Sequence, residues 1–196
     1  GLNNFIWVKI GTGIGSGIIV DADIYRGASG VAGNIGHIEA DHNGTICRCG
    51  NRGCLEAMAA GPAIAQRGKQ AAEAGRSPLL AKKSDENDGK ISAANVGEAA
   101  ASGDTAAIEI IRDSGRLIGL VLASLVEFFN PEVIYIGGGV SKIGFTLLSS
   151  IRQAVLQRAN ALSTRDLHVE YSELGEMAGV VGAVVLTFRH IFEVAE

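Results

Sequence analysis

The chain has 196 residues, 47% of them hydrophobic, and a formal net charge of −4 at pH 7. This length and apolar content can bury one good core or form one large lobe of a divided fold. The acidic balance argues against nucleic-acid binding by this segment, because such surfaces normally carry clustered lysine and arginine. The apolar runs are shorter than the roughly 20 residues that span a membrane, and no signal peptide opens the chain, so we expect no membrane contact.

Two apolar runs separated by glycines open the chain. Residues 5–10 (FIWVKI) and 18–20 predict strands around the bend GTGIGSG at 11–17, and a turn at 21–23 follows. Such bends let backbone N–H groups approach a phosphate. A plain hairpin loop is the alternative interpretation of this bend. A G-x-G-x-x-G phosphate-binding fingerprint needs a helix after it, and here a strand follows. The first residue is not Met and a strand begins almost at once, so we interpret the chain as a fragment.

The segment from residue 33 to residue 56 holds all three cysteines, in the order His-x9-Cys-x-Cys-x4-Cys. A Cys3His set suits Zn²⁺, which takes thiolates and imidazole in a tetrahedron. A disulfide framework and buried unligated thiols are the weaker alternatives, because three cysteines cannot all pair and a Cys-x-Cys disulfide is strained. His42 competes with His37 as the fourth ligand but lies in a polar turn, so His37 is preferred. Free cysteines in this spacing fit a reducing cytoplasm.

Helices dominate the middle of the chain. Residues 57–73 are rich in alanine, with a proline just after Gly61, and predict two helices that meet there. Residues 75–89 are polar and predict an exposed excursion. A short helix is expected at 96–100, and Gly103 and Asp104 should stop it and cap the next one. Residues 105–129 predict a long helix whose apolar positions, among them Phe128, recur near a 3.6 period.

The last third of the chain alternates strands and helices. Residues 133–136 predict a buried strand that runs into three glycines, followed by a helix at 144–161. A strand at 168–171 and a closing helix at 177–194 complete the pattern, and Gly179 and Gly182 should let that helix pack closely. This order of elements predicts an α/β layered lobe.

The glycine and cysteine pattern carries a family resemblance. Gly-x-x-Gly-x-Ala-Gly-x-x-Gly-His followed by Cys-x-Cys-Gly-x-x-Gly-Cys-x-Glu resembles the signature of the ROK family, which groups bacterial sugar kinases with sugar-responsive transcriptional repressors. The positions in register are Gly27, Gly30, Ala32, Gly33, Gly36, His37, Cys47, Cys49, Gly50, Gly53, Cys54 and Glu56. The resemblance covers nearly the whole chain. It implies the C-terminal lobe of an actin-like ATPase (ribonuclease H-like) fold with a zinc-stapled loop.

The resemblance also implies metal and sugar sites. In the family the cysteines and the histidine hold zinc, which implies His37, Cys47, Cys49 and Cys54 as ligands. The same histidine, the glutamate after the last cysteine and a glutamate three residues before the histidine bind sugar. These positions are His37, Glu56 and Asn34 here. Asn34 departs from the pattern, because an amide lacks the charged double acceptor of a carboxylate.

The resemblance further implies that two glycine bends contact the phosphates and the nucleotide, if this chain retains the nucleotide site of the family. The first bend resembles the phosphate loop of the second lobe in actin-like sugar kinases, which implies contacts from Gly11, Thr12, Gly13 and Gly15. The triple glycine corresponds to the adenosine side of the cleft, at Gly137, Gly138 and Gly139. A simple tight turn explains the triple glycine equally well.

The resemblance leaves two functional hypotheses. In the first, the chain is the effector-sensing domain of a transcriptional repressor that binds a sugar or sugar phosphate and contacts DNA only through an N-terminal module outside this chain. The residues of the cysteine segment, from Cys47 to Glu56, resemble the repressor branch more closely, and Asn34 also favours it. In the second, it is the C-terminal lobe of a glucokinase-like hexose kinase that uses ATP and Mg²⁺. A lobe without any ligand is a third possibility. In either branch the resemblance implies zinc, a cytoplasmic protein and a homo-oligomer.

The family's kinases keep their general-base aspartate in a region that precedes the part matched here. Asp21 and Asp23 cannot replace it, because they lie in a hairpin turn on the wrong side of the glycine bend. We therefore assign no catalytic residue to this chain.

Overall fold

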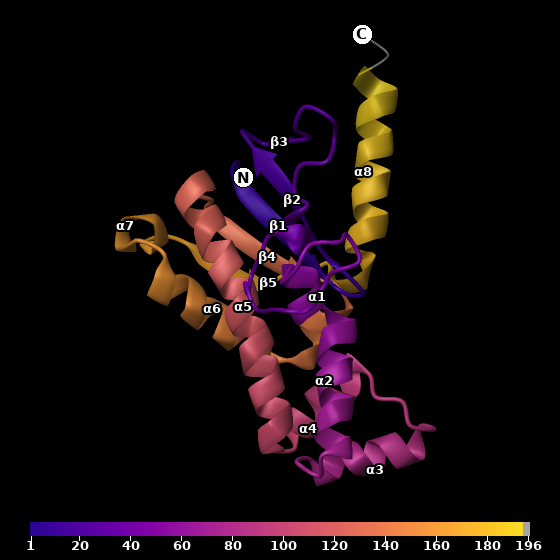
Figure 1. Cartoon of the computed structure of the whole chain (residues 1–196). Coiled ribbons are helices and arrows are strands. Elements are labelled where there is room, and N and C mark those ends of the chain that lie inside the picture. Colours follow the sequence, from indigo (N-terminus) through magenta and orange to yellow (C-terminus); the bar gives the residue numbers. More distant parts are fainter. Residues whose placement is uncertain (194–196) are drawn as a thin grey trace.

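The computed structural model describes residues 1–193 and shows an α/β fold built on one mixed five-stranded sheet (Figure 1). The strands lie in the order β3-β2-β1-β4-β5. β1 pairs antiparallel with β2 and parallel with β4, and β4 pairs parallel with β5. The bounds of the strands are Phe5–Ile10 for β1, Ile14–Val20 for β2, Asp23–Ile24 for β3, Val133–Gly137 for β4 and His168–Tyr171 for β5. The expected α/β class is therefore confirmed.

The side chains of β1 alternate between a packed face and an open face of the sheet. This alternation follows from the two-residue period of a strand. On the packed face the chain buries Ile6, Val8 and Ile10, whereas the open face carries Phe5, Trp7 and Lys9. Lys9 is exposed there, near the end of the strand.

Two helices cover the packed face. α5 (Thr105–Phe129) and α6 (Phe145–Arg158) lie side by side (Figure 1). A Cβ added at Gly115 or Gly119 would come within 2.6 Å of a Cβ on α6, so these glycines allow close approach of the two helices. The Asp104 side chain accepts a hydrogen bond from the backbone N–H of Ala107 and caps α5 as expected. The predicted bounds of α5 are also confirmed.

Four further helices form a layer with the first half of α5 beyond the end of the sheet (Figure 1). Their bounds are Leu55–Ala59 for α1, Gly61–Glu73 for α2, Pro78–Glu86 for α3 and Ala93–Ala101 for α4. α1 and α2 meet at Ala60 and Gly61, which confirms the expected pair of helices. α4 begins just after Ser92, because Ser92 and Asn95 form a capping box at its start.

Residues 75–89 are mostly exposed as expected, but they form a helix, α3, that is anchored by two buried residues. Ser77 is buried, accepts a hydrogen bond from the Leu80 N–H at 3.1 Å and starts α3. Its hydroxyl also donates to Asp104 Oδ2 at 2.6 Å, which ties the start of α3 to the start of α5. Leu80 is fully buried against the core. The polar composition of this segment gave no helical pattern. One cap and one buried leucine are enough to stabilise the helix once neighbouring helices provide an apolar surface.

Leu80→Ala tests this correction. We expect a loss of about 2–5 kcal/mol of folding stability, because the change leaves a cavity among packed helices. Leu79→Ala is the matched control, since Leu79 is 38% exposed and should cost far less. Thermal unfolding of the full-length protein measures both variants, and equal small effects would contradict the buried role of Leu80.

Three smaller predictions also need correction. Strand β2 begins at Ile14, so the bend between β1 and β2 is only Gly11 to Gly13. The predicted helix at 144–161 ends at Arg158, and a separate turn, α7 (Ala161–Thr164), follows. Phe128 is 83% exposed because it lies on the outer side of the last turn of α5.

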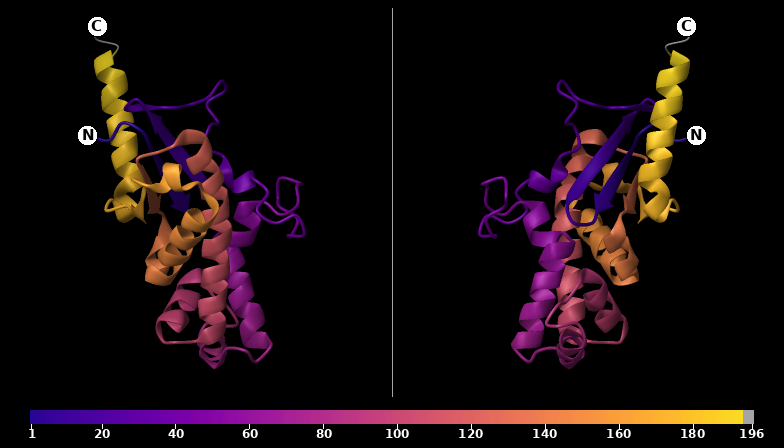
Figure 2. Two further views of the ribbon diagram at one scale, coloured as in Figure 1. Left: turned by 90° about the vertical axis from the view of Figure 1, so that its left-hand side faces the viewer. Right: turned by 90° about the vertical axis from the view of Figure 1, so that its right-hand side faces the viewer.

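The closing helix, α8 (Ala178–Glu193), stands on the side of the sheet opposite α5 (Figure 2). Its apolar side chains remain exposed in the described residues, and Arg189 forms an ion pair with Asp23 at 2.8 Å. The prediction that Gly179 and Gly182 let this helix pack closely is wrong for the described residues, because a Cβ at either position would meet no atom within 4 Å. The predicted end at Val194 lies outside the described residues. No helix within 1–193 is long and apolar enough to cross a membrane.

Candidate functional site

The cysteine segment folds as a small loop whose backbone is held by its own hydrogen bonds. The N–H of Cys47 donates to the Asn51 carbonyl at 2.7 Å, and the Gly50 N–H donates to the Cys47 carbonyl at 2.9 Å. Gly50 and Gly53 have φ values of 93° and 69°, which glycine adopts without the strain that a side chain would add. The turn between Cys47 and Cys54 is thereby closed on itself.

The four predicted metal ligands converge in this loop. His37 ends the short 3-10 helix η1 (Ile35–His37), and its Nδ1 lies 3.6 Å from Cys47 Sγ. Cys49 Sγ lies 3.6 Å from Cys54 Sγ, and all four donor atoms lie within 4.8 Å of one another. A tetrahedron with Zn–S bonds of about 2.3 Å has sulfur atoms about 3.8 Å apart. The spacing therefore fits a tetrahedral metal ion and is far too long for a disulfide bond.

Two cysteine thiols of the loop differ in the direction in which their pKa values are shifted. Burial raises the pKa of the Cys54 thiol to about 12, whereas a hydrogen bond from the Asn51 backbone lowers the pKa of Cys49. A bound cation would favour the thiolate form of Cys54, because metal ligation requires deprotonated sulfur. His42 pairs with Glu39 at 3.2 Å and lies outside the cluster, which agrees with the choice of His37.

The two arginines of this loop contact groups other than the sulfurs. Arg52 donates to the Gly44 carbonyl at 2.9 Å and braces the loop. Arg48 donates to Glu56 Oε1 at 3.1 Å, with its own side chain 87% exposed. No pattern in the sequence indicates this pair, because the two residues meet only through the fold of the loop.

Glu56 links the cysteine loop to the first glycine bend. Its side chain is 17% exposed, and Oε2 accepts a hydrogen bond from the Ile14 N–H at 3.1 Å, across 42 residues of sequence. A Cβ at Gly13 would lie 2.3 Å from the same oxygen, so only glycine lets the bend pass this close. Both carboxylate oxygens of Glu56 are therefore engaged.

The segment that carries Asn34 and His37 runs alongside the start of β2. The Gly33 carbonyl accepts hydrogen bonds from the Ser16 N–H at 2.8 Å and from its hydroxyl at 3.1 Å. A Cβ at Gly36 would lie 2.2 Å from the Ile14 carbonyl oxygen and 3.3 Å from Glu56 Cβ. Asn34 itself is exposed. The structure thus brings the three residues predicted to bind sugar to one end of β2, although they come from separate segments.

The two glycine bends lie next to each other at the carboxyl ends of β1 and β4. Lys9 pairs with Gly137 in the parallel register, and a Cβ at Gly138 would lie 2.4 Å from the Ile10 carbonyl. The Gly61 N–H at the start of α2 donates to the Gly11 carbonyl at 2.8 Å. Ligands of α/β sheets commonly bind outside the carboxyl ends of parallel strands. The short 3-10 helix η2 (Gly139–Ile143) begins at the last of the three glycines and precedes α6.

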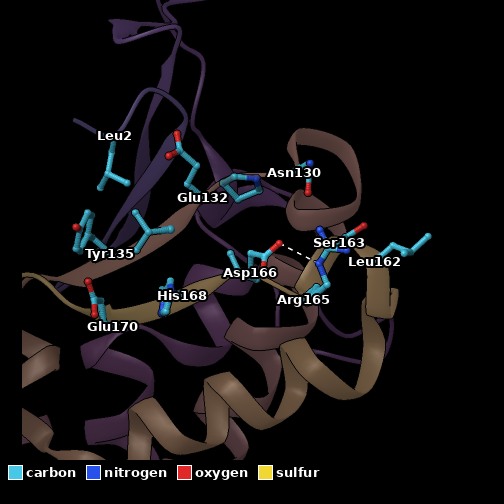
Figure 3. Close-up of a pocket in the computed structure, with 13 residues that line it drawn as sticks. Leu2, Asn130, Glu132, Tyr135, Leu162, Ser163, Arg165, Asp166, His168 and Glu170 are labelled. Carbon is cyan, nitrogen blue, oxygen red and sulfur yellow. Dashed lines mark hydrogen bonds and ion pairs between the residues drawn. The ribbon is translucent and has the colours of Figure 1, made fainter.

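A hollow of about 480 Å³ lies at the other end of the sheet (Figure 3). Glu132, Tyr135, His168 and Glu170 line it, and Arg165 and Asp166 form an ion pair at its side. Glu132 and His168 stand at the amino ends of β4 and β5. This hollow is therefore separate from the glycine bends and the cysteine loop, and it contains none of the predicted site residues.

Comparisons with known proteins agree with this geometry. A profile of the ROK family matches residues 1–190. The chain is 32% identical over 185 residues to a putative xylose repressor of Caldicellulosiruptor sp. (strain Rt8B.4), covering 94% of the chain and 46% of that protein. It is 36% identical over 183 residues to a glucokinase of Halalkalibacterium halodurans, covering 93% of the chain and 55% of that protein.

A solved structure shows the same arrangement of elements. It is a ROK family glucokinase from Streptomyces griseus in complex with glucose and AMPPNP, with a TM-score of 0.84, 35% identity and coverage of 95% of this chain and 61% of that one. The chain thus spans about half the length of the curated relatives named above. Both repressors and kinases are among its relatives. From the family match and the shared fold we conclude that the chain belongs to the ROK family.

Proposed function

We propose that the chain is the C-terminal lobe of the sugar-sensing domain of a ROK family transcriptional regulator. In this proposal a sugar or sugar phosphate binds near Asn34, His37 and Glu56. Binding would favour one arrangement of the lobes and so change the DNA affinity of an N-terminal module outside this chain. The relative described as a putative xylose repressor supports this class of function.

The observation that carries the proposal is the chemistry of the sugar-binding positions. Asn34 stands where the family pattern has a glutamate, and Glu56 is already engaged by the Ile14 N–H and the Arg48 guanidinium. Asp21 and Asp23 lie after the far end of β2, and the Ile24 N–H and Arg189 hold the pKa of Asp23 below its ordinary value. A binding domain tolerates this set of groups. A phosphoryl transferase must orient the attacking hydroxyl, and the amide of Asn34 lacks the charged double acceptor that a glutamate offers at this position.

We also propose that the four donors of the cysteine loop hold zinc as a structural ion. The set offers three thiolates and one imidazole. These four ligands fill the tetrahedron and leave no coordination position for water, which is typical of a closed site. Zinc would fix the loop that presents Arg48 to Glu56 and would orient His37. The other ring nitrogen of His37 would then be directed toward a ligand hydroxyl or a neighbouring acceptor.

A kinase lobe is the second candidate, and one observation favours it. The two glycine bends are adjacent at the carboxyl ends of parallel strands, where a nucleotide could approach the backbone closely. The relative solved with glucose and AMPPNP has the same fold. In this candidate the bends would hold ATP with Mg²⁺, and the catalytic base would come from a lobe outside this chain.

An ADP-release assay with the full-length protein separates the two candidates. We supply ATP, Mg²⁺ and a panel of sugars that includes glucose and xylose, and we compare turnover with and without sugar. The regulator proposal expects no sugar-dependent ADP release. Sugar-dependent turnover at about 1 s⁻¹ or faster, in the ordinary enzyme range, would contradict it and make Asn34 a specificity change in a working kinase.

A further inference from the structure

Lys9 has an unusual position for an exposed lysine. It lies on β1, which is a central strand with β2 on one side and β4 on the other. Lysines in sheets typically protect edge strands against pairing, and a central strand needs no such protection. Its partners in register are Gly15 on β2 and Gly137 on β4. No side chain therefore flanks Lys9 on the neighbouring strands, and its ammonium group can reach a ligand.

The side chain of Lys9 runs toward the first glycine bend. Its Cε lies 3.8 Å from the place where a Cβ on Gly11 would be. Trp7, two residues earlier on the same face, packs over Gly137, where a Cβ would lie 2.6 Å from the indole ring. The indole thus occupies the space behind Lys9. The lysine stem consequently follows the strand toward Gly11 and Thr12.

Among the described residues, the charges around the bend leave Lys9 without a counterion. Within residues 1–193 no carboxylate forms an ion pair with Lys9. Glu56 lies beside Gly13, and its Oε1 is paired with Arg48. One side of the bend therefore presents a cation, an exposed threonine hydroxyl and glycine backbone. A lysine beside a glycine bend is a recurrent way to hold a phosphate.

We propose that Lys9 binds a phosphate group of the ligand at the Gly11 to Gly13 bend. The phosphate would belong either to a sugar phosphate effector or to a nucleotide, because both offer the same anionic oxygens to the ammonium group. This inference rests on the proposed function only in placing the ligand at this end of the sheet. It adds a charged side chain, Lys9, to the backbone contacts that the family resemblance implies for this bend.

Calorimetry of the full-length protein tests the assignment with three probes: glucose, glucose 6-phosphate, and AMPPNP with Mg²⁺. Lys9→Met removes the charge and keeps the length of the side chain. We expect it to weaken binding of a phosphate-bearing probe about tenfold, the size of one charged hydrogen bond, and to change glucose binding less than twofold. Lys9→Arg should keep most of the affinity. Lys90→Met, at another exposed lysine, should have no effect.

The probes also identify the source of the phosphate. A loss for glucose 6-phosphate alone assigns Lys9 to a sugar phosphate, and a loss for AMPPNP alone assigns it to a nucleotide. The inference is overturned if the wild-type protein binds neither phosphate-bearing probe, or binds one of them equally well with Lys9→Met. Absence of sugar binding together with a Lys9-dependent AMPPNP signal would instead contradict the proposed function and leave the lysine assignment standing.

Discussion

Cys49→Ser is expected to remove bound zinc and to destabilise the full-length protein by about 4 kcal/mol or more, as is usual when a structural metal is lost. The reason lies in the geometry of the loop, where the four donor atoms lie within 4.8 Å of one another and one bound ion would hold them together. Loss of the ion would leave Cys54 buried and the turn between Cys47 and Cys54 held by backbone hydrogen bonds and by the contacts of Arg48 and Arg52. A change of this size lowers the Tm by roughly 10 °C in a domain of this length.

Metal analysis and thermal unfolding of the same samples check this result. The wild-type protein should contain close to one zinc per chain and should lose stability when a chelator removes it. His42→Ala is the matched control, because His42 is in the same loop but pairs with Glu39 outside the donor cluster. It should retain zinc and stability. A zinc-free wild-type protein, or zinc loss in His42→Ala, would contradict the proposed ligand set.

Glu56→Ala is expected to weaken sugar binding by about 10- to 100-fold, because hydrogen bonds to a charged acceptor contribute about 1.5–3 kcal/mol each. The change also frees the Ile14 N–H and the Arg48 guanidinium, so it loosens the contact between the cysteine loop and the glycine bend. Glu56→Gln separates these effects. It keeps an acceptor for the Ile14 N–H but removes the charge, and we expect it to bind sugar more weakly than wild type and better than Glu56→Ala.

Calorimetry with glucose and xylose measures these variants, and zinc content shows whether the metal loop is intact. Arg48→Ala is the companion variant, since it leaves the carboxylate in place and removes its partner. If Glu56→Ala binds sugar as well as wild type while zinc is retained, Glu56 has no place in the ligand site. His37→Ala is unsuitable as a test of sugar binding, because it would disrupt the proposed metal ligands as well.

The cysteine loop couples these two experiments. Arg48 lies between Cys47 and Cys49 in the sequence and reaches Glu56, which in turn accepts the N–H of Ile14. A ligand that contacts Glu56 would therefore act on the loop and on the glycine bend together. Removing zinc should consequently weaken sugar binding even though the carboxylate of Glu56 is unchanged.

Local chemistry in the sequence was enough to predict several parts of this protein. The bounds of α5 follow from Asp104 as a cap and from Asn130 and Pro131 as a stop, all within a few residues of the helix ends. The four donors of the cysteine loop lie within 18 residues, so their spacing alone indicated that they would converge. The glycine and cysteine signature likewise identified the family, which the family profile confirms.

Other parts depended on contacts that no local pattern contains. α3 looked like a polar loop, because only its packing against α2 and α4 buries Leu80. Phe128 fits the helical period yet is exposed, since the period does not say where the neighbouring elements end. The links from Glu56 to Ile14 and from Arg48 to Glu56, and the glycines that leave Lys9 unflanked, arise when distant segments meet. Periodicity and spacing thus fix what one segment does alone, whereas the tertiary structure decides which segments share a site.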